Sequence, residues 1–267
     1  MHLNISELEG VHEEADRHRL FGVDVTAVTI PDLLAALELS VERGEQLTVF
    51  TQNLHGAYLQ ARSPLMRAAY QAADLAYIDG MPFIWHNRLL GGHFERRHRT
   101  TYLDWHHQFY ELAEKFGWKV FYLGGTRESF KLSRDILLED FPDLRFDGHD
   151  GYFDVNTLSG DNMEIVDKIN RFGPDVLIVG MGMPRQEIWV ADNRALLDVP
   201  AIVTVGAGND YIAGLIPTPP RWMGRLGLEW LYRLVTEPHR LWRRYLLEPI
   251  YLLPTWAGEV GRRWWPF

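Results

Sequence analysis

Short apolar segments alternate with longer amphipathic ones along most of this chain, and this alternation constrains the fold more than any other sequence feature. The short segments are rich in Val, Ile and Leu and predict strands over 22–30, 47–51, 75–78, 119–123, 144–146, 176–179 and 201–205. The longer segments predict helices over 31–43, 54–73 with a break at Pro64, 102–116, 127–139, 162–172 and 184–196. This order is typical of an α/β fold with a mostly parallel, Rossmann-like sheet and helices on both faces.

Composition divides the chain into three parts. Residues 1–19 are polar and acidic, without the apolar core of a signal peptide, and we expect a mobile N-terminal arm. Residues 20–216 carry the alternating pattern and form the predicted α/β body. Residues 217–267 form a predicted helical appendage, joined to the body by the proline-rich stretch 216–220. The four-residue spacing of Trp222, Leu226, Trp230 and Leu234 predicts a helix over 222–234, and a second helix is expected to begin around Pro238, with Thr236 or Glu237 as its start signal. No segment reaches the roughly 18 apolar residues that a membrane-spanning helix needs.

The appendage differs from the body in charge and in aromatic content. The chain has a formal net charge of −9, yet residues 217–267 contain eight Arg and four Glu with neither Lys nor Asp. They also hold six of the ten Trp residues. An acidic body disfavours nucleic-acid binding, whereas Trp beside Arg is typical of proteins on anionic lipid. We therefore expect the appendage to face a membrane surface; the alternative is packing on the body or on another subunit of a homo-oligomer.

Polar or glycine-rich residues follow five of the predicted strands. Ligands of such sheets bind outside the carboxyl ends of the strands. The five segments are Thr51–Asn53, Asp79–Gly80, Tyr122–Gly125, Gly180–Glu187 and Gly206–Asp210. We expect the functional site at this edge of the sheet.

The segment from Gly180 to Glu187 has the composition of a phosphate-binding turn. Gly180 and Gly182 follow an apolar strand, and Pro184 opens the next helix. Glycines let backbone N–H groups approach a phosphate, and a helix N-terminus adds partial positive charge. Gln186 and Glu187 follow, where they can bind a ribose or a base. The alternative is a tight turn without a ligand, because the complete G-x-G-x-x-G pattern is absent.

Asp79 is the candidate general base. It stands directly after an apolar strand and before a glycine. A carboxylate at this position can remove the proton of a sugar hydroxyl as that hydroxyl attacks. Asp is also a common helix N-cap, and the pattern leaves both roles open.

We predict neither a metal nor another cofactor. The chain contains no cysteine and no Asp-x-Asp pair, so Cys-ligated zinc is excluded and a carboxylate pair for a divalent ion is missing. In a reaction that releases a diphosphate, arginines and helix N-termini can stabilise the leaving group in place of a metal ion. The appendage contains these arginines.

Four segments together resemble one known family. They are TQN after the strand 47–51, IDG around Asp79, PDVLIVGMGMPRQEIW from Pro174, and LEWLYRLVTEPHRLWRRY from Leu228. Their order and spacing resemble the WecG/TagA/CpsF glycosyltransferases over about residues 21–245. The likeness implies sugar transfer from a UDP-sugar to a polyprenyl-diphosphate-linked saccharide, with inversion, without a required metal, at the cytoplasmic face of the membrane. It implies that residues 20–216 are a catalytic body and that the appendage serves the same site.

The resemblance also implies site residues. Asp79 is the expected catalytic base, with Thr51 beside it. The expected diphosphate-binding arginines of the appendage are Arg233, Arg240 and Arg243. The expected donor-binding residues are Asn53, Gly124, Gly180, Gly182, Gln186, Glu187 and Asp210.

Three segments depart from the family pattern. Thr218-Pro219-Pro220 replaces an Arg-Ala-Pro, residues 98–104 replace an Arg-x-x-Gly-x-Asp-like segment, and GAGND at 206–210 differs slightly from a Gly-rich Phe-Asp segment. The sequence therefore does not identify the sugars. A membrane-surface nucleotide-binding protein without catalysis is the alternative function. A nucleotide-dependent oxidoreductase is disfavoured, because the first strand–helix turn lacks the glycine-rich fingerprint.

Overall fold

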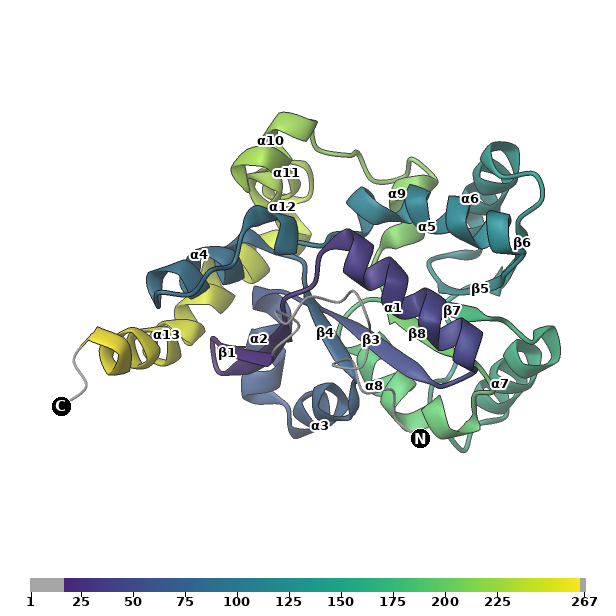
Figure 1. Cartoon of the computed structure of the whole chain (residues 1–267), viewed down its shortest axis with the longest axis horizontal. Coiled ribbons are helices and arrows are strands. Elements are labelled where there is room, and N and C mark those ends of the chain that lie inside the picture. The colour runs from purple at the N-terminus through teal and green to yellow at the C-terminus, as the bar shows by residue number, and fades with distance from the viewer. Residues whose placement is uncertain (1–16, 265–267) are drawn as a thin grey trace.

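The computed structural model describes residues 17–264, except for the side chains of Arg221 and Arg225. Residues 17–264 form an eight-stranded sheet in the order β1-β2-β4-β3-β8-β7-β5-β6 (Figure 1). Its strands are β1 (Arg17–Leu20), β2 (Val23–Thr26), β3 (Leu47–Gln52), β4 (Leu75–Ile78), β5 (Lys119–Gly124), β6 (Arg145–His149), β7 (Val176–Gly180) and β8 (Ala201–Thr204). β1 is antiparallel to β2 and the remaining pairs are parallel, which confirms the predicted α/β fold.

Helices cover both faces of this sheet (Figure 1). Those of the body are α1 (Ile30–Arg43), α2 (Leu54–Arg62), α3 (Pro64–Ala72), α4 (Met81–Leu89), α5 (Tyr102–Phe116), α6 (Arg127–Asp140), α7 (Gly160–Phe172), α8 (Arg185–Asn193) and α9 (Gly208–Ile212). Thr29 caps α1 with Pro31 in its first turn, and the predicted break before Pro64 separates α2 from α3. Helix α4 was not expected from the sequence, because its buried side chains include polar His86 and Asn87 as well as Phe83 and Ile84.

The central strands alternate between two apolar cores. Val120 and Tyr122 of β5 pack into the core beneath α1 and α5, which is dominated by the fully buried Trp105. Phe121 and Leu123 point to the opposite core, beneath α3, α7 and α8. Because both faces of the sheet are covered, the central strands β4, β5, β7 and β8 are almost continuous apolar runs. Polar groups therefore remain at the strand ends.

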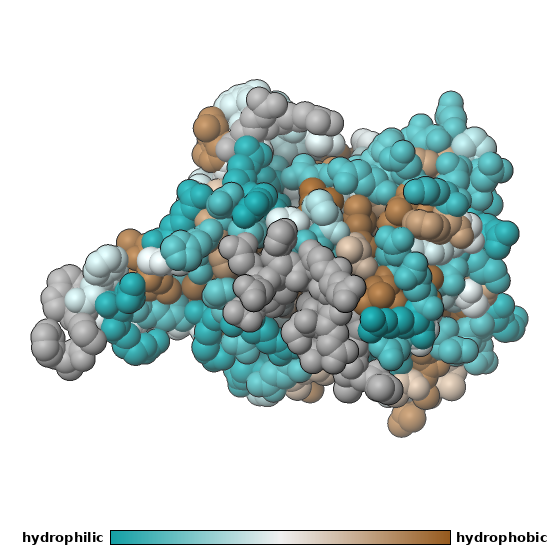
Figure 2. Space-filling view, viewed as in Figure 1, coloured by the Kyte–Doolittle hydropathy of each residue, from teal (hydrophilic) through white to brown (hydrophobic). Residues whose placement is uncertain are grey.

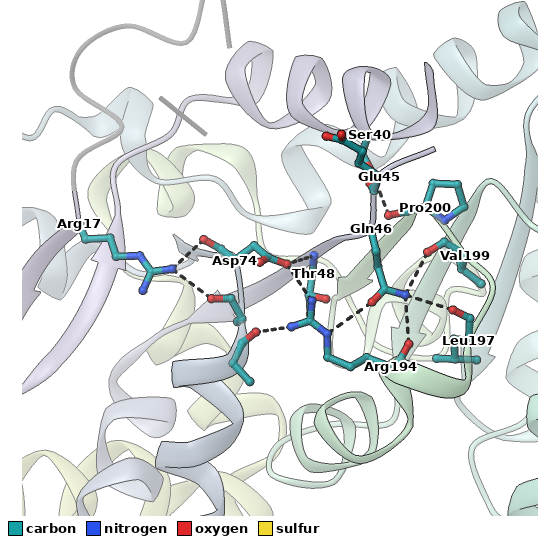
Figure 3. A network of polar contacts seen from close by, with 12 residues as sticks. Arg17, Ser40, Glu45, Gln46, Thr48, Asp74, Arg194, Leu197, Val199 and Pro200 are labelled. Atoms are coloured by element: carbon teal, nitrogen blue, oxygen red, sulfur yellow. Dashed lines mark hydrogen bonds and ion pairs between the residues drawn. The ribbon is translucent and has the colours of Figure 1, made fainter. Parts of the chain in front are cut away.

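A polar network closes the amino ends of β3, β4 and β8 (Figure 3). The Asp74 carboxylate accepts hydrogen bonds from the Thr48 backbone at 2.8 Å and from Arg194 at 3.4 Å. Gln46 donates to the carbonyl oxygens of Arg194 and Leu197, both at 3.1 Å. These contacts tie the amino ends of the three strands together, at the edge opposite to the one where ligands of such sheets bind.

The appendage consists of α10 (Arg221–Leu226), α11 (Glu229–Thr236), α12 (Pro238–Trp242), a π-helical turn (Arg243–Leu247) and α13 (Glu248–Trp264). We call residues 217–264 the tail. A single helix over 222–234, expected from the four-residue spacing of Trp222, Leu226, Trp230 and Leu234, is wrong. Gly227 adopts φ 70° and ends α10, and a Cβ at this position would lie 2.9 Å from the Met81 side chain of α4. The expected start of a helix at Pro238 is confirmed, with Glu237 as N-cap.

Helix α13 extends from the sheet alongside α4 (Figure 1). Arg263 and Trp264 near its end donate hydrogen bonds to the carbonyl oxygens of Leu90 and Leu89. Glu259 accepts the backbone N–H groups of Phe21 and Gly22 at 2.9 and 2.8 Å. Within residues 17–264, no helix is both long enough and apolar enough to cross a bilayer. Residues 1–16 of the predicted arm lie outside the described residues, whereas 17–19 belong to β1.

Candidate active site

A cavity of about 580 Å³ lies at the carboxyl ends of β3, β4 and β8. The body forms its floor with residues that follow these strands, such as Thr51, Asp79 and Gly206. The tail forms its other wall, with residues from α11, α12, the π-helical turn and the start of α13. The predicted edge of the sheet and the predicted appendage therefore meet at one site.

Asp79 lines this cavity at the end of β4. Gln52 of β3 pairs with Ile78 of β4, so Asn53 and Asp79 emerge side by side. The N-cap of α4 is Gly80, so Asp79 is not the helix cap that the sequence left open. Burial raises the pKa of Asp79, while hydrogen bonding by Thr101 and the charge of Arg99 lower it. A carboxylate with a raised pKa is a stronger base than an exposed one.

Thr51 and Asn53 hold the floor beside Asp79. The Thr51 carbonyl oxygen accepts a hydrogen bond of 2.6 Å from the Tyr70 hydroxyl. The Thr51 backbone N–H donates to the Thr204 hydroxyl at 3.1 Å. The Asn53 side-chain oxygen caps α2 by accepting the Gly56 N–H at 3.1 Å. Because this cap fixes the amide, its nitrogen is directed to Asp79, where the hydrogen bond lowers the carboxyl pKa. Asn53 therefore contacts the candidate base as well as the cavity.

Gln186 connects two glycine loops at the cavity floor. Its side-chain oxygen accepts the N–H groups of Gly182 at 3.0 Å and of Gly206 at 3.1 Å. Its side-chain nitrogen donates to Glu187 at 2.7 Å. Gln186 and Gly182 line the cavity, and both the oxygen and the nitrogen of the Gln186 side chain have hydrogen-bond partners within the protein. The loop predicted to bind phosphate is therefore held in place by the glutamine that follows it.

Glu187 is buried behind this floor. Its side chain is fully shielded from solvent, and burial raises its pKa to about 7. Oε1 accepts the hydrogen bond from Gln186, whereas Oε2 has no partner among the described residues. A protonated Glu187 satisfies this environment better than a buried carboxylate.

Gly124, Gly180, Glu187 and Asp210 are expected donor residues that do not line the cavity. A side chain at Gly124 would meet the Gly180 carbonyl, and one at Gly180 would meet the Tyr122 hydroxyl, so both positions require glycine for strand packing. Asp210 accepts a hydrogen bond of 2.5 Å from the Ser129 hydroxyl. The donor-binding roles of all four stay predictions.

The three expected arginines line the cavity in different states. Arg233 lies over the Tyr211 ring at 5.6 Å from its centroid and 3.8 Å from Glu237. Arg240 donates to Glu237 at 2.6 Å. Arg243 is exposed and lies over the Trp242 ring. Arg240 and Arg243 therefore already contact protein side chains, Glu237 and Trp242 respectively, without a ligand.

Arg244 is a fourth cavity arginine, which the sequence analysis did not select. No described residue accepts a hydrogen bond from its guanidinium or lies within ion-pair distance of it. The guanidinium lies over the Tyr245 ring, 5.8 Å from the ring centroid. Burial lowers the pKa of Arg244, and its charge lowers the pKa values of Asp79 and of His55. The π-helical turn that begins at Arg243 alters the helical spacing, and such turns are frequent at functional sites. The Arg-Arg doublet was the one sequence signal for it.

Two further contacts between tail and body were missed. His55 of α2 lies 2.6 Å from the Glu248 carboxylate at the start of α13. Arg99 binds Glu229 at the start of α11. No motif indicated either pair, because the partners lie more than a hundred residues apart in the sequence. Among residues 17–264, no cluster of three or more acidic or histidine side chains is placed to hold a metal ion.

Comparisons with known proteins agree with this geometry. The family described as "Glycosyl transferase WecG/TagA/CpsF family" matches residues 18–264. A protein of Bacillus spizizenii is 28% identical over 76% of this chain and 76% of its own length, and one of Bacillus subtilis is 28% identical over 69% of each. A Staphylococcus aureus protein is 29% identical over 55% of this chain and 56% of its own length. All three are named N-acetylglucosaminyldiphosphoundecaprenol N-acetyl-beta-D-mannosaminyltransferase.

The matched region includes the strands, the cavity floor and the tail that closes over it. A catalytic role is thereby favoured over nucleotide binding alone, and the protein is a glycosyltransferase. The chain belongs to the WecG/TagA/CpsF family of glycosyl transferases.

Proposed function

We propose that this glycosyltransferase moves N-acetylmannosamine from its UDP-activated form to N-acetylglucosamine on undecaprenyl diphosphate, for a cell-surface polysaccharide. The main support is that the Asp79 carboxylate lines one cavity together with Arg244, which has no ion-pair partner among the described residues. Body and tail together form this cavity. A base and a cation in one site suit a reaction that takes a proton and releases an anion. The names of the relatives support this choice of sugars.

The reaction is an inverting single displacement. The acceptor hydroxyl attacks the anomeric carbon of the donor, its proton passes to Asp79, and the bond from the anomeric carbon to the UDP oxygen breaks. Asn53 and Thr101 hold the Asp79 carboxylate by hydrogen bonds, so its position does not depend on the substrate. One nucleophile and one base require no covalent intermediate on the protein.

Arginines stabilise the departing diphosphate without a metal ion. Arg233 and Arg244 face the cavity from the tail, and Arg244 has no ion-pair partner among the described residues. A guanidinium binds phosphate oxygens through several N–H groups, which spreads the developing negative charge. Their fixed positive charges perform the role that a divalent ion has in other glycosyltransferases.

The tail also binds the membrane surface as a peripheral element on the cytoplasmic side. Large exposed apolar residues occur on each tail helix: Trp222, Leu226, Val235, Trp242, Ile250, Tyr251, Leu253 and Trp264. Figure 2 shows hydrophobic residues on the part of the molecule where α4 and α13 extend from the sheet. A lipid-linked acceptor stays in the bilayer, so its diphosphate reaches the cavity most directly if the tail lies on the surface.

Vesicle flotation tests this docking. A double change of Trp222→Ala and Leu226→Ala should reduce binding to anionic vesicles while UDP affinity stays unchanged. Leu158→Ala is the matched control, because Leu158 is 92% exposed on the body and should not affect flotation. Equal flotation of the double variant and the control would contradict a membrane-docking tail.

Transfer assays test the sugar assignment. The purified chain should form a disaccharide from UDP-N-acetylmannosamine and N-acetylglucosaminyl-diphosphoundecaprenol, with a β linkage visible by NMR. UDP-glucose and UDP-N-acetylglucosamine are the comparison donors. Preference for another donor would overturn the proposed sugar, and a retained anomeric configuration would overturn the single displacement.

A further inference from the structure

Arg99 lies on a segment that is fixed to the strand carrying the candidate base. Residue 99 forms a parallel bridge with Ile78, one residue before Asp79. The Thr100 N–H donates to the Ile78 carbonyl oxygen at 2.7 Å, and the Thr100 hydroxyl donates to the Val28 carbonyl oxygen at 2.8 Å. Thr101 then hydrogen-bonds to the Asp79 carboxylate. The backbone of residues 99–101 is therefore rigidly related to Asp79.

The Arg99 side chain contacts the tail, while its charge also acts on the Asp79 carboxylate. Its Nη2 donates to both carboxylate oxygens of Glu229 at 2.8 Å, and its Nη1 donates to the Gly224 carbonyl oxygen at 3.2 Å. The Arg99 side chain is 3% exposed. A Cβ at Gly224 would lie 2.6 Å from the Glu229 carboxylate, so glycine makes this close approach feasible. Asp104 lies farther away, at 3.7 Å.

Glu229 begins the helix that carries Arg233. The two residues are one helical turn apart on α11, and both line the cavity. A displacement of the first turn of α11 therefore displaces the Arg233 guanidinium relative to the cavity floor. Among the described residues, no hydrogen bond or ion pair joins Asp79 to Arg233, and the two groups interact only through their charges.

We propose that the Arg99–Glu229 ion pair sets the position of the tail arginine Arg233 relative to the Asp79 carboxylate, so that both members of the pair are positioning residues for sugar transfer. The inference rests on the proposed function for the roles of Asp79 and Arg233. The link between body and tail, which we call the joint, consists of the hydrogen bonds that Arg99 makes to α10 and α11 of the tail.

The burial of this pair makes it sensitive to the loss of one partner. A buried charge that loses its counterion destabilises its surroundings more than the intact pair stabilises them. Burial raises the pKa of Glu229, and the nearby Arg99 counteracts that rise. Glu229→Gln leaves Arg99 with only the more distant Asp104 carboxylate at 3.7 Å, and Arg99→Met leaves Glu229 without its cation. Either change should loosen α11.

A double-mutant cycle on the full chain tests the joint. The variants are Glu229→Gln, Arg99→Met and their combination, with Asp24→Asn as control. Asp24 forms an ion pair with Arg19 at 3.2 Å that is exposed on the surface, where such pairs contribute little. Tryptic cleavage of the tail, UDP affinity and transfer kinetics are measured on each variant. The cleavage arm needs no substrate, so it reports on the joint even if the proposed sugars are wrong.

The proposal predicts that each single variant speeds tail cleavage about tenfold or more and lowers kcat by a similar factor, while the control matches wild type. The combined variant should lose no more than the worse single one, because both changes break one interaction. Unchanged cleavage in Glu229→Gln would overturn the joint. So would multiplicative loss of kcat in the double variant, or normal kcat in a folded Arg99→Met, because the pair would then be broken without an effect on transfer.

Discussion

The side-chain oxygen of Gln186 lies 3.0 Å from the backbone nitrogen of Gly182 and fixes the loop that follows β7. The same oxygen accepts the Gly206 N–H, so one side chain joins the ends of two neighbouring strands. The geometry of the cavity floor therefore depends on a single amide.

Gln186→Ala should weaken UDP binding about tenfold or more, because two partly buried N–H groups lose their acceptor and the loops separate. Isothermal titration calorimetry measures this change. Gln46→Ala is the control: Gln46 binds three carbonyl oxygens at the opposite edge of the sheet, so its loss should lower the melting temperature without altering UDP affinity. Normal UDP affinity in Gln186→Ala would show that the floor does not need this amide.

Arg244→Ala should reduce transfer about 10²-fold, the usual scale for removing a group that stabilises developing charge. Arg243→Ala should cost at least tenfold less, because Arg243 is exposed and lies over the Trp242 ring. Steady-state kinetics on both variants compare neighbouring arginines of identical chemistry. A larger loss in Arg243→Ala would reverse their assignment.

Glu187 should make stability depend on pH near neutrality. Its pKa is about 7 in the fold, above the ordinary value of 4.5, so the folded state binds more protons between these values. Stability is therefore full below the unfolded pKa and declines as the pH rises through about 7. Urea unfolding between pH 5 and pH 8 should show this decline, and Glu187→Gln should flatten it. The same slope in both proteins would contradict a buried, protonated Glu187.

Chelation should leave transfer unaffected, because arginines supply the positive charge at the diphosphate. The assay compares the rate in excess EDTA with the rate in magnesium or manganese. Activity that is lost in EDTA and recovered with either ion would overturn the arginine account of the leaving group.

The strand and helix pattern of the body could be predicted because the sheet is covered on both faces. Helix 102–116 was predicted with the bounds that α5 has in the structure, since it carries Trp105 and Phe109 on one buried face and ends at a left-handed Gly117. Strand-end residues such as Asp79 were found for the same reason, because each buried strand stops where polarity begins. Helix α4 was missed because His86 and Asn87 interrupt its apolar pattern while being buried.

The tail was predicted less well, because its geometry depends on distant contacts. Gly227 splits the expected single helix where it packs against Met81 of α4, and this contact leaves no local signal. Regular helical spacing favours Arg240 and Arg243, which are three residues apart, but the π-helical turn over 243–247 departs from this spacing, and Arg244 is more buried than the exposed Arg243. The hydrogen bond between His55 and Glu248 and the ion pair between Arg99 and Glu229 bridge body and tail. Such pairs require the folded arrangement.

Asp79→Asn is the most direct test of the account. The change removes the proton acceptor and keeps the size of the side chain, and Asn53 and Thr101 remain nearby. Burial raises the pKa of Asp79, so the neutral side chain should not destabilise the fold. Turnover is measured with UDP-N-acetylmannosamine and the lipid-linked acceptor, with UDP affinity determined on the same preparation. We predict a rate at least about 10²-fold below wild type with UDP binding retained; a near-normal rate would show that Asp79 is not the catalytic base.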